Sequence, residues 1–118
     1  MRISKIFIIM FLVLTSSMFA QQVQTGIYRF DRNLSDYTLD KNDGDRVVQI
    51  EVTFHKPFEV KPEVLVSVNF LDCDKTTNLR YEVKTISVSR DGFLVQVKTW
   101  SDTRIFAIGG GWMAVSGK

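Results

Sequence analysis

The sequence of 118 residues contains only one cysteine, one histidine and two prolines. Its longest apolar run, residues 6–14, covers nine positions. A single cysteine cannot form an intramolecular disulfide. One histidine excludes a His-rich zinc site, and one cysteine beside it cannot supply a convincing Cys–His catalytic pair. Nine apolar residues are less than half of the roughly 20 that a membrane-spanning helix needs.

Acidic residues are absent from the first 20 positions, which contain two basic residues, Arg2 and Lys5. A short positive segment, the apolar run and a small residue at Ala20 together have the layout of a secretory signal peptide. We therefore predict a signal peptide at residues 1–20, cleavage after Ala20, and a secreted protein that is extracellular or periplasmic. A membrane anchor is the alternative that the short apolar run disfavours.

The charge of the chain changes once this leader is set aside. The full sequence has 15 basic and 13 acidic residues, so residues 21–118 keep 13 of each and have no net charge. A neutral, mixed surface offers no electrostatic attraction for nucleic acid or for an anionic membrane. Residues 21–118 are predicted to form one domain that binds neither nucleic acid nor, after cleavage, a membrane.

Apolar residues alternate with polar ones along most of the domain, which is the period of a half-buried β-strand. Short turn-forming segments separate these runs, and no stretch shows a sustained helical period. We predict an all-β fold, a six-stranded antiparallel β-sandwich. The predicted strands cover residues 26–30, 48–54, 64–70, 81–88, 93–97 and 104–115, with residues 31–41 as a surface loop.

Three of these segments carry irregularities. In residues 64–70 the valines and Phe70 share one phase, which predicts that they face the core together. The apolar phase changes within residues 81–88, which predicts a bulge or a strand that changes partner. Gly109, Gly110 and Gly111 interrupt the last strand, and two interpretations stay open: a bulge near the sheet end, or close approach of a neighbouring subunit with Trp112 as an interface anchor.

Residues that could carry catalysis or bind metal are few. Cys73 stands between two aspartates, so a loop thiol without special reactivity is predicted, with an intermolecular disulfide as the alternative. His55 is predicted to be an ordinary strand-end residue, since no Gly-x-Ser-x-Gly motif is present to pair with it. Asp43-Gly44-Asp45 resembles part of a calcium loop but lacks the later glutamate. No catalytic residue, metal or cofactor is predicted, although two carboxylates converging in space would still permit a hydrolase.

Recognition of a sugar requires an aromatic ring, a planar hydrogen-bond donor and a carboxylate acceptor. Trp100 follows a predicted strand and is out of phase with its core residues, so it should point outwards. Arg80 lies at the start of the predicted strand 81–88, after a polar loop. Asp43 and Asp45 lie in the loop before Val47, and either could supply the carboxylate. Residue types alone leave two alternatives open, because the tryptophan could cap the core and the arginine could form a surface ion pair.

From Arg46 onwards the sequence resembles the H-type lectin domain family of snail agglutinins and discoidins. The resemblance rests on several short motifs that occur in the family's order over roughly 70 residues. They are Val52-Thr53-Phe54 with Pro57, Phe58 and Pro62, residues 64–68 before Asp72, Asn78-Leu79-Arg80, Gly92-Phe93, Thr99-Trp100-Ser101-Asp102-Thr103 and Gly111-Trp112-Met113-Ala114.

This resemblance implies a trimer, or a hexamer of two trimers, that binds galactose or N-acetylgalactosamine at shallow sites between protomers. It places Trp100 as the sugar-stacking residue, Arg80 as a hydrogen-bonding residue and Asp43 as the acid from the adjacent protomer, with Asp45 as the alternative. Ser101 stands where snail relatives have a histidine, so preference for the N-acetyl group is left open. The snail cysteines are also absent, so disulfide-linked assembly is not implied.

The sequence thus predicts a multivalent, non-enzymatic lectin suited to cell adhesion, with Asp43, Arg80, Trp100 and Ser101 as its carbohydrate-binding residues. The competing prediction is a structural or adhesive trimeric β-sandwich that has lost sugar binding.

Overall fold

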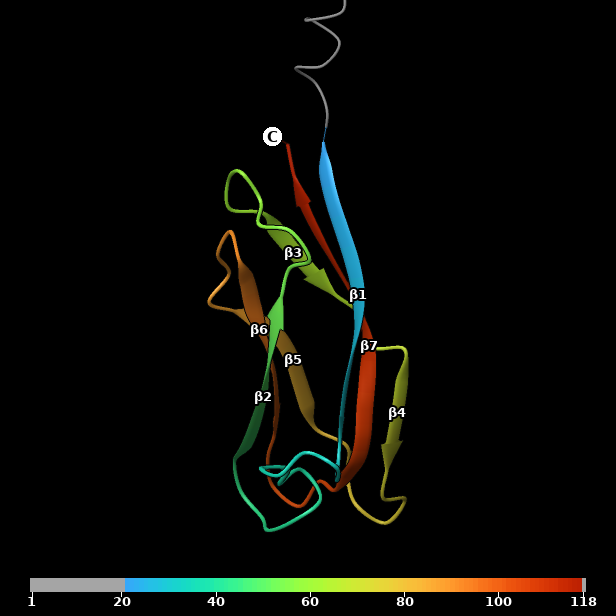
Figure 1. Cartoon of the computed structure of the whole chain (residues 1–118). Helices are drawn as coiled ribbons and strands as arrows, with labels where there is room; N and C mark the ends of the chain where they lie inside the picture. The colour runs from blue at the N-terminus through green and yellow to red at the C-terminus, as the bar shows by residue number, and fades with distance from the viewer. Residues whose placement is uncertain (1–20, 118) are drawn as a thin grey trace, which may run out of the picture.

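The computed structural model describes residues 21–117, so the predicted signal peptide lies outside the described residues. Seven strands form two antiparallel sheets that face each other as a β-sandwich (Figure 1). Strand β7 lies between β1 on one side and β3 and β4 on the other, and β6 lies between β2 and β5. No helix in residues 21–117 is long and apolar enough to cross a membrane. The strands are β1 (Gln22–Asp31), β2 (Arg46–Thr53), β3 (Glu63–Val66), β4 (Phe70–Cys73), β5 (Tyr81–Ile86), β6 (Gly92–Thr99) and β7 (Ile105–Ser116).

Alternation along the sequence correctly predicts the inward face of β2 and β6. Val48 pairs with Val97 and Ile50 with Val95 across the two strands. Partners in an antiparallel pair point to the same face, so these side chains enter the core together. The sandwich fold is confirmed, and the strand count is seven instead of six.

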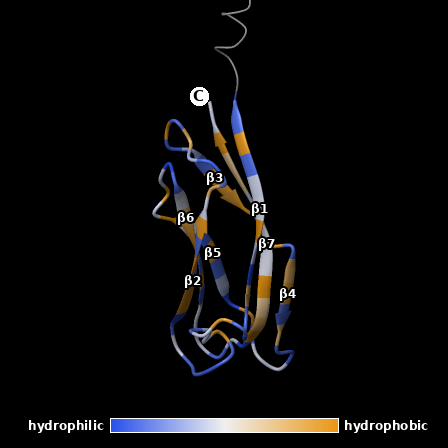
Figure 2. Cartoon of the chain, in the orientation of Figure 1, coloured by the Kyte–Doolittle hydropathy of each residue, from blue (hydrophilic) through white to orange (hydrophobic). Residues whose placement is uncertain are grey.

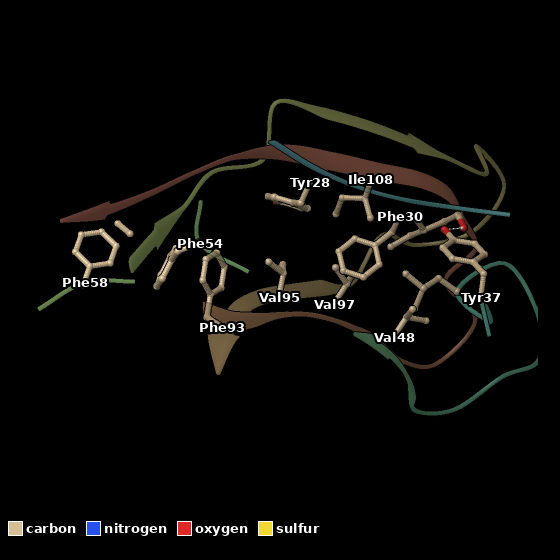
Figure 3. Packing of buried hydrophobic residues seen from close by; sticks show 13 residues of the cluster. Tyr28, Phe30, Tyr37, Val48, Phe54, Phe58, Phe93, Val95, Val97 and Ile108 are labelled. Carbon is tan, nitrogen blue, oxygen red and sulfur yellow. Dashed lines mark hydrogen bonds between the residues drawn. The ribbon is translucent and has the colours of Figure 1, made fainter. Parts of the chain in front are cut away.

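The core fills the space between the two sheets (Figure 3). Phe30 lies in its middle and is completely buried. An aromatic cluster fills one end, where the ring of Phe54 lies 4.9 Å from Phe58, 5.6 Å from Phe93 and 5.9 Å from Trp112, centroid to centroid. Such tilted and edge-on aromatic pairs stabilise beyond the apolar area that they bury.

The additional strand arises because the predicted run 64–70 is divided by a bulge. Val66 pairs with Trp112 but Phe70 pairs with Gly109, so four steps on one strand match three on β7. The additional residue turns the following side chains to the other face. Phe70 therefore lies on the outer face, 37% exposed, with the Arg29 guanidinium 4.6 Å from its ring centroid. The prediction that Phe70 faces the core is wrong.

Gly110 is the residue of β7 that lies opposite this bulge. A Cβ at position 110 would lie 1.8 Å from the carbonyl oxygen of Ser67, so only glycine fits. The bulge is thus in the partner strand, and the close approach comes from the chain's own backbone, so both interpretations of the glycine run need correction. Trp112 packs against Phe93 inside the sandwich, with 5.3 Å between ring centroids, which is not the position of an interface anchor.

Strand β5 is regular and pairs with β6 throughout, contrary to the prediction of a bulge or a change of partner. Its pairing with β6 runs without a shift from Tyr81 opposite Thr99 to Ile86 opposite Leu94. The chain then turns at Ser87, which has a positive φ of 55°. The phase change in the sequence therefore marks the end of the strand.

Residues 32–45 connect β1 to β2 and close one end of the sandwich. Tyr37 and Leu39 are buried in the core, so the prediction of a surface loop is wrong for these two residues. The Tyr37 hydroxyl donates a hydrogen bond to the carbonyl oxygen of Ile105, 2.6 Å away. Apolar residues are needed here because two facing sheets leave the end of their core open to water.

Tyr37→Phe should lower the free energy of unfolding by about 1–3 kcal/mol, because the buried carbonyl of Ile105 would lose its donor. Urea denaturation measures the change, and Tyr81→Phe, at an exposed position, should change it by less than about 0.5 kcal/mol. An equal loss in both variants would contradict this assignment.

Alkaline pH should destabilise the fold through the same side chain. Burial and then the charge of Asp40 raise the pKa of Tyr37 far above its ordinary value. The folded protein therefore keeps a proton that the unfolded chain releases, so stability is complete below about pH 10 and falls above it. Tyr37→Phe should reduce this alkaline loss, as measured by denaturation between pH 8 and pH 11.

Cys73 lies in a strand, and His55 lies just after one. Cys73 ends β4 and is half-buried against the core, so it is a strand residue and not the predicted loop thiol. His55 is exposed just after β2, where its backbone N–H donates to the side-chain oxygen of Gln24 at 3.0 Å.

Candidate lectin site

Three loops gather at the end of the sandwich where β1, β4 and β6 finish (Figure 1). They cover residues 32–45, 74–80 and 100–104. All four predicted site residues lie in these loops, so the fold brings to one end side chains that are up to 58 positions apart (101 − 43). Hydrophilic residues are frequent in these loops, as Figure 2 shows.

Trp100 points away from the core, as its phase predicts. It directly follows β6, in which Phe93, Val95, Val97 and Thr99 are the buried residues. The tryptophan is 36% exposed, and the Lys98 ammonium lies 6.0 Å from its ring centroid. An aromatic face is thus available to a ligand at the end of the sheet.

Arg80 lies beside Trp100 because the next residue, Tyr81, is paired with Thr99 across the β5–β6 ladder. Two threonines fix its backbone: its N–H donates to the Thr103 hydroxyl at 3.0 Å, and its carbonyl accepts from Thr99. Its guanidinium donates to Asp102 at 3.1 Å and remains partly exposed. Arg80 therefore presents partly exposed N–H donors at the same end of the sheet as the tryptophan.

Asp43 and Asp45 lie at the same end but contact other cations. The Arg104 guanidinium donates to Asp43 at 2.8 Å, and the Lys98 ammonium lies 3.5 Å from Asp45. Both carboxylates are highly exposed. Gly44, with a φ of 82°, forms the turn between them. The structure therefore brings Arg80, Trp100 and Ser101 together and places Asp43 in the neighbouring loop, within the same protomer.

Ser101 joins the loop of residues 100–104 to the loop of residues 32–45 through its backbone. Its carbonyl oxygen accepts the Gly44 N–H at 2.9 Å, and its φ of 61° is in the left-handed region. A non-glycine residue adopts this conformation at a cost, and such residues cluster at binding sites.

Arg46 organises this end of the molecule, although it was not among the predicted residues. Its guanidinium is buried and donates to backbone carbonyls from both loops. Burial lowers the pKa of Arg46, and the nearby positive charge of Arg104 lowers it further, but a guanidinium still stays charged at neutral pH. A signal was present: Arg46 shares the phase of Val48 and Ile50 in β2, so a charged residue occupies a core position. The accepting carbonyls belong to Leu39, Lys41, Gly44, Ser101 and Thr103.

Three of the ion pairs at this end involve the loops around Trp100: Arg80 with Asp102, Arg104 with Asp43 and Lys98 with Asp45. Exposed pairs of this kind contribute little to stability. Each pair joins opposite charges, so these six side chains together add no net charge beside Trp100. Within residues 21–117, no group of three His, Cys, Asp or Glu side chains is arranged to hold a metal ion.

A comparison with known protein families matches the H-type lectin domain to residues 49–115, more than half of the chain. The chain belongs to the H-type lectin domain family. This is a family of carbohydrate-binding lectins, which points to binding and not to catalysis.

Two known proteins illustrate what this H-type lectin domain is similar to. The ATP synthase subunits region ORF 7 protein of Fuscovulum blasticum is 36% identical over 72 residues, which cover 61% of this chain and 63% of that protein. Discoidin II of Dictyostelium discoideum superimposes with a TM-score of 0.74 at 22% identity, over 84% of this chain and 38% of the discoidin chain. The present chain thus spans less than two thirds of either protein, and the discoidin match shows a shared fold.

Proposed function

We propose that this H-type lectin domain belongs to a secreted lectin that binds terminal galactose or N-acetylgalactosamine. The observation that carries the proposal is the exposed Trp100 at the end of β6, with the partly exposed Arg80 at the adjoining end of β5. A pyranose ring has one apolar face that packs on an indole, and vicinal hydroxyls that match a planar donor. The guanidinium of Arg80 is paired with Asp102, so it is not a free positive charge for an anionic ligand, which favours an uncharged sugar.

Each predicted residue has a role in this proposal. Trp100 stacks on the sugar ring, and the Arg80 guanidinium donates to its hydroxyls. Ser101 adds a polar contact through its hydroxyl. Asp43 accepts from a hydroxyl of the sugar that is bound to the adjacent protomer, a role open to it because its carboxylate is largely exposed.

Several copies are needed for such a site to be effective, because a shallow site binds weakly. The outer face of the β1–β7–β3 sheet supports assembly: Ile27 is 86% exposed and Leu65 is 68% exposed, and both lie on this face beside Met113. The outer face of the other sheet is more polar, with Glu51 and Lys98 on it and Gln49 hydrogen-bonded to Gln96 at 2.8 Å. An apolar sheet face opposite a polar one is typical of a surface that a second copy covers, here within a trimer.

A glycan array with the full domain and its Trp100→Ala variant tests the proposal. The domain should bind glycans that end in galactose or N-acetylgalactosamine. In Trp100→Ala the affinity of each site should fall at least tenfold, which corresponds to about 1.4 kcal/mol of lost stacking. Trp100→Phe, which keeps an aromatic face, should retain most of the binding.

Other results would favour the alternatives. An intact oligomer that binds no glycan at high protein concentration would indicate a structural or adhesive sandwich. Cleavage of the glycans would indicate a hydrolase that uses its carboxylates.

A further inference from the structure

We infer that Arg46 is a positioning residue of the sugar site, acting through the loop that carries Trp100 and Ser101. The inference rests on the proposed function for its ligand, but its structural part is independent of which sugar binds. Arg46 itself is 6% exposed, so it acts from beneath the site and not by touching the ligand.

The first step is the distribution of the Arg46 hydrogen bonds. In the loop before β2, its Nε donates to Gly44 at 2.9 Å and its Nη1 to Lys41 at 3.1 Å. In the loop after β6, Nη1 donates to Thr103 at 2.7 Å and Nη2 to Ser101 at 2.9 Å. One rigid, planar group thus connects the loop of Asp43 to the loop of Trp100.

The second step is the conformation of Ser101. Its φ of 61° is unfavourable for serine, and its carbonyl oxygen accepts both the Arg46 Nη2 and the Gly44 N–H. These two bonds hold a conformation that the loop alone would populate less. Because Trp100 and Asp102 flank Ser101, the same bonds set the direction of the indole and of the carboxylate that binds Arg80.

The third step is the chemistry of the guanidinium. It has five N–H donors in a fixed plane, so it can serve carbonyls on opposite sides at once. A lysine ammonium at this position would keep the charge, but its three donors around one atom are too few for the five carbonyls that Arg46 contacts. Arg46→Lys is therefore expected to preserve the fold and loosen the site.

The test compares Arg46→Lys with Arg90→Lys. Arg90 donates to the carbonyl of Phe58 at 2.8 Å, near the opposite end of the sandwich, so it controls for loss of an arginine–carbonyl bond. Titration calorimetry with N-acetylgalactosamine should show at least a tenfold weaker affinity for Arg46→Lys and no change for Arg90→Lys. Urea denaturation and analytical ultracentrifugation should show a folded protein of wild-type assembly in both.

Hydrogen exchange gives a readout that needs no ligand. In Arg46→Lys, the Gly44 amide and the amides of residues 100–104 should exchange faster, while those of β1 and β7 stay protected. If the wild-type domain binds no sugar but this exchange pattern is seen, the proposed function fails and the positioning role stands. Wild-type affinity together with wild-type exchange in Arg46→Lys would overturn the inference. If Arg46→Lys does not fold, Arg46→Gln is the second variant, because it buries no charge. The same loss of affinity and the same faster exchange are expected for it.

Discussion

Replacing Gly110 by alanine should lower the free energy of unfolding by at least about 3 kcal/mol, or prevent the native fold from forming. The new Cβ would lie 1.8 Å from the Ser67 carbonyl oxygen and 2.7 Å from its carbonyl carbon. Both atoms belong to the backbone of the bulge, so a change of rotamer cannot relieve the clash. The β3–β4 segment would have to move away from the centre of the sheet, which urea denaturation followed by tryptophan fluorescence would detect.

Gly111→Ala is the matched control for this prediction. Its Cβ would meet nothing closer than the Gly26 carbonyl oxygen at 3.6 Å, an ordinary contact. Alanine also restricts the unfolded chain more than glycine does, so stability should stay within about 1 kcal/mol of the wild type or rise. A Gly110→Ala protein with the wild-type denaturation midpoint would show that the bulge is not held against β7 in solution.

Changing Leu65 to lysine should convert the proposed oligomer to a monomer and weaken binding to a dense glycan surface by about 10²–10⁴-fold. Leu65 is 68% exposed in the single chain, so the substitution removes little from the fold of one protomer. It would place a charge among the apolar side chains that the assembly is proposed to bury, which is costly. Light scattering after gel filtration measures the mass, and a glycan-coated sensor measures the avidity.

Val47→Lys serves as the comparison, because Val47 is 45% exposed on the outer face of the β2–β6–β5 sheet. It should leave both mass and avidity unchanged. A Leu65→Lys protein of wild-type mass, or a wild-type protein that is monomeric at high concentration, would contradict assembly through the β1–β7–β3 face.

Alternation along the chain predicted the strands well wherever one strand pairs regularly with the next. It failed at Phe70 because the phase of a strand depends on its partner as well as on its own residues. The bulge requires Gly110 on β7, more than 40 positions away in sequence from Ser67, together with the Tyr28 hydroxyl that donates to the Ser67 carbonyl at 2.7 Å. No local pattern contains these contacts.

Only those features of the site that depend on local pattern could be predicted. The exposure of Trp100 is one of them, because it follows from the alternation of β6, which the tryptophan directly follows. The ion pair between Asp43 and Arg104 joins residues 61 positions apart, and no spacing rule predicts it. Arg46 was missed although its place in the apolar phase of β2 marked it as a buried charge in need of partners.

The position of β7 has a consequence for how the domain is made. This strand is the last of the seven in sequence, yet β1, β3 and β4 all pair with it, and Gln22 is opposite Ser116. The sheet of β1, β3, β4 and β7 therefore cannot form until residues 105–116 have emerged from the ribosome. Folding must then close loops that span nearly the whole domain, and for all-β proteins with such distant pairings it takes about milliseconds to seconds. Until β7 pairs with them, β1 and β3 expose unpaired backbone and apolar side chains, which favours aggregation. The yield of folded protein should therefore depend on temperature and concentration during synthesis.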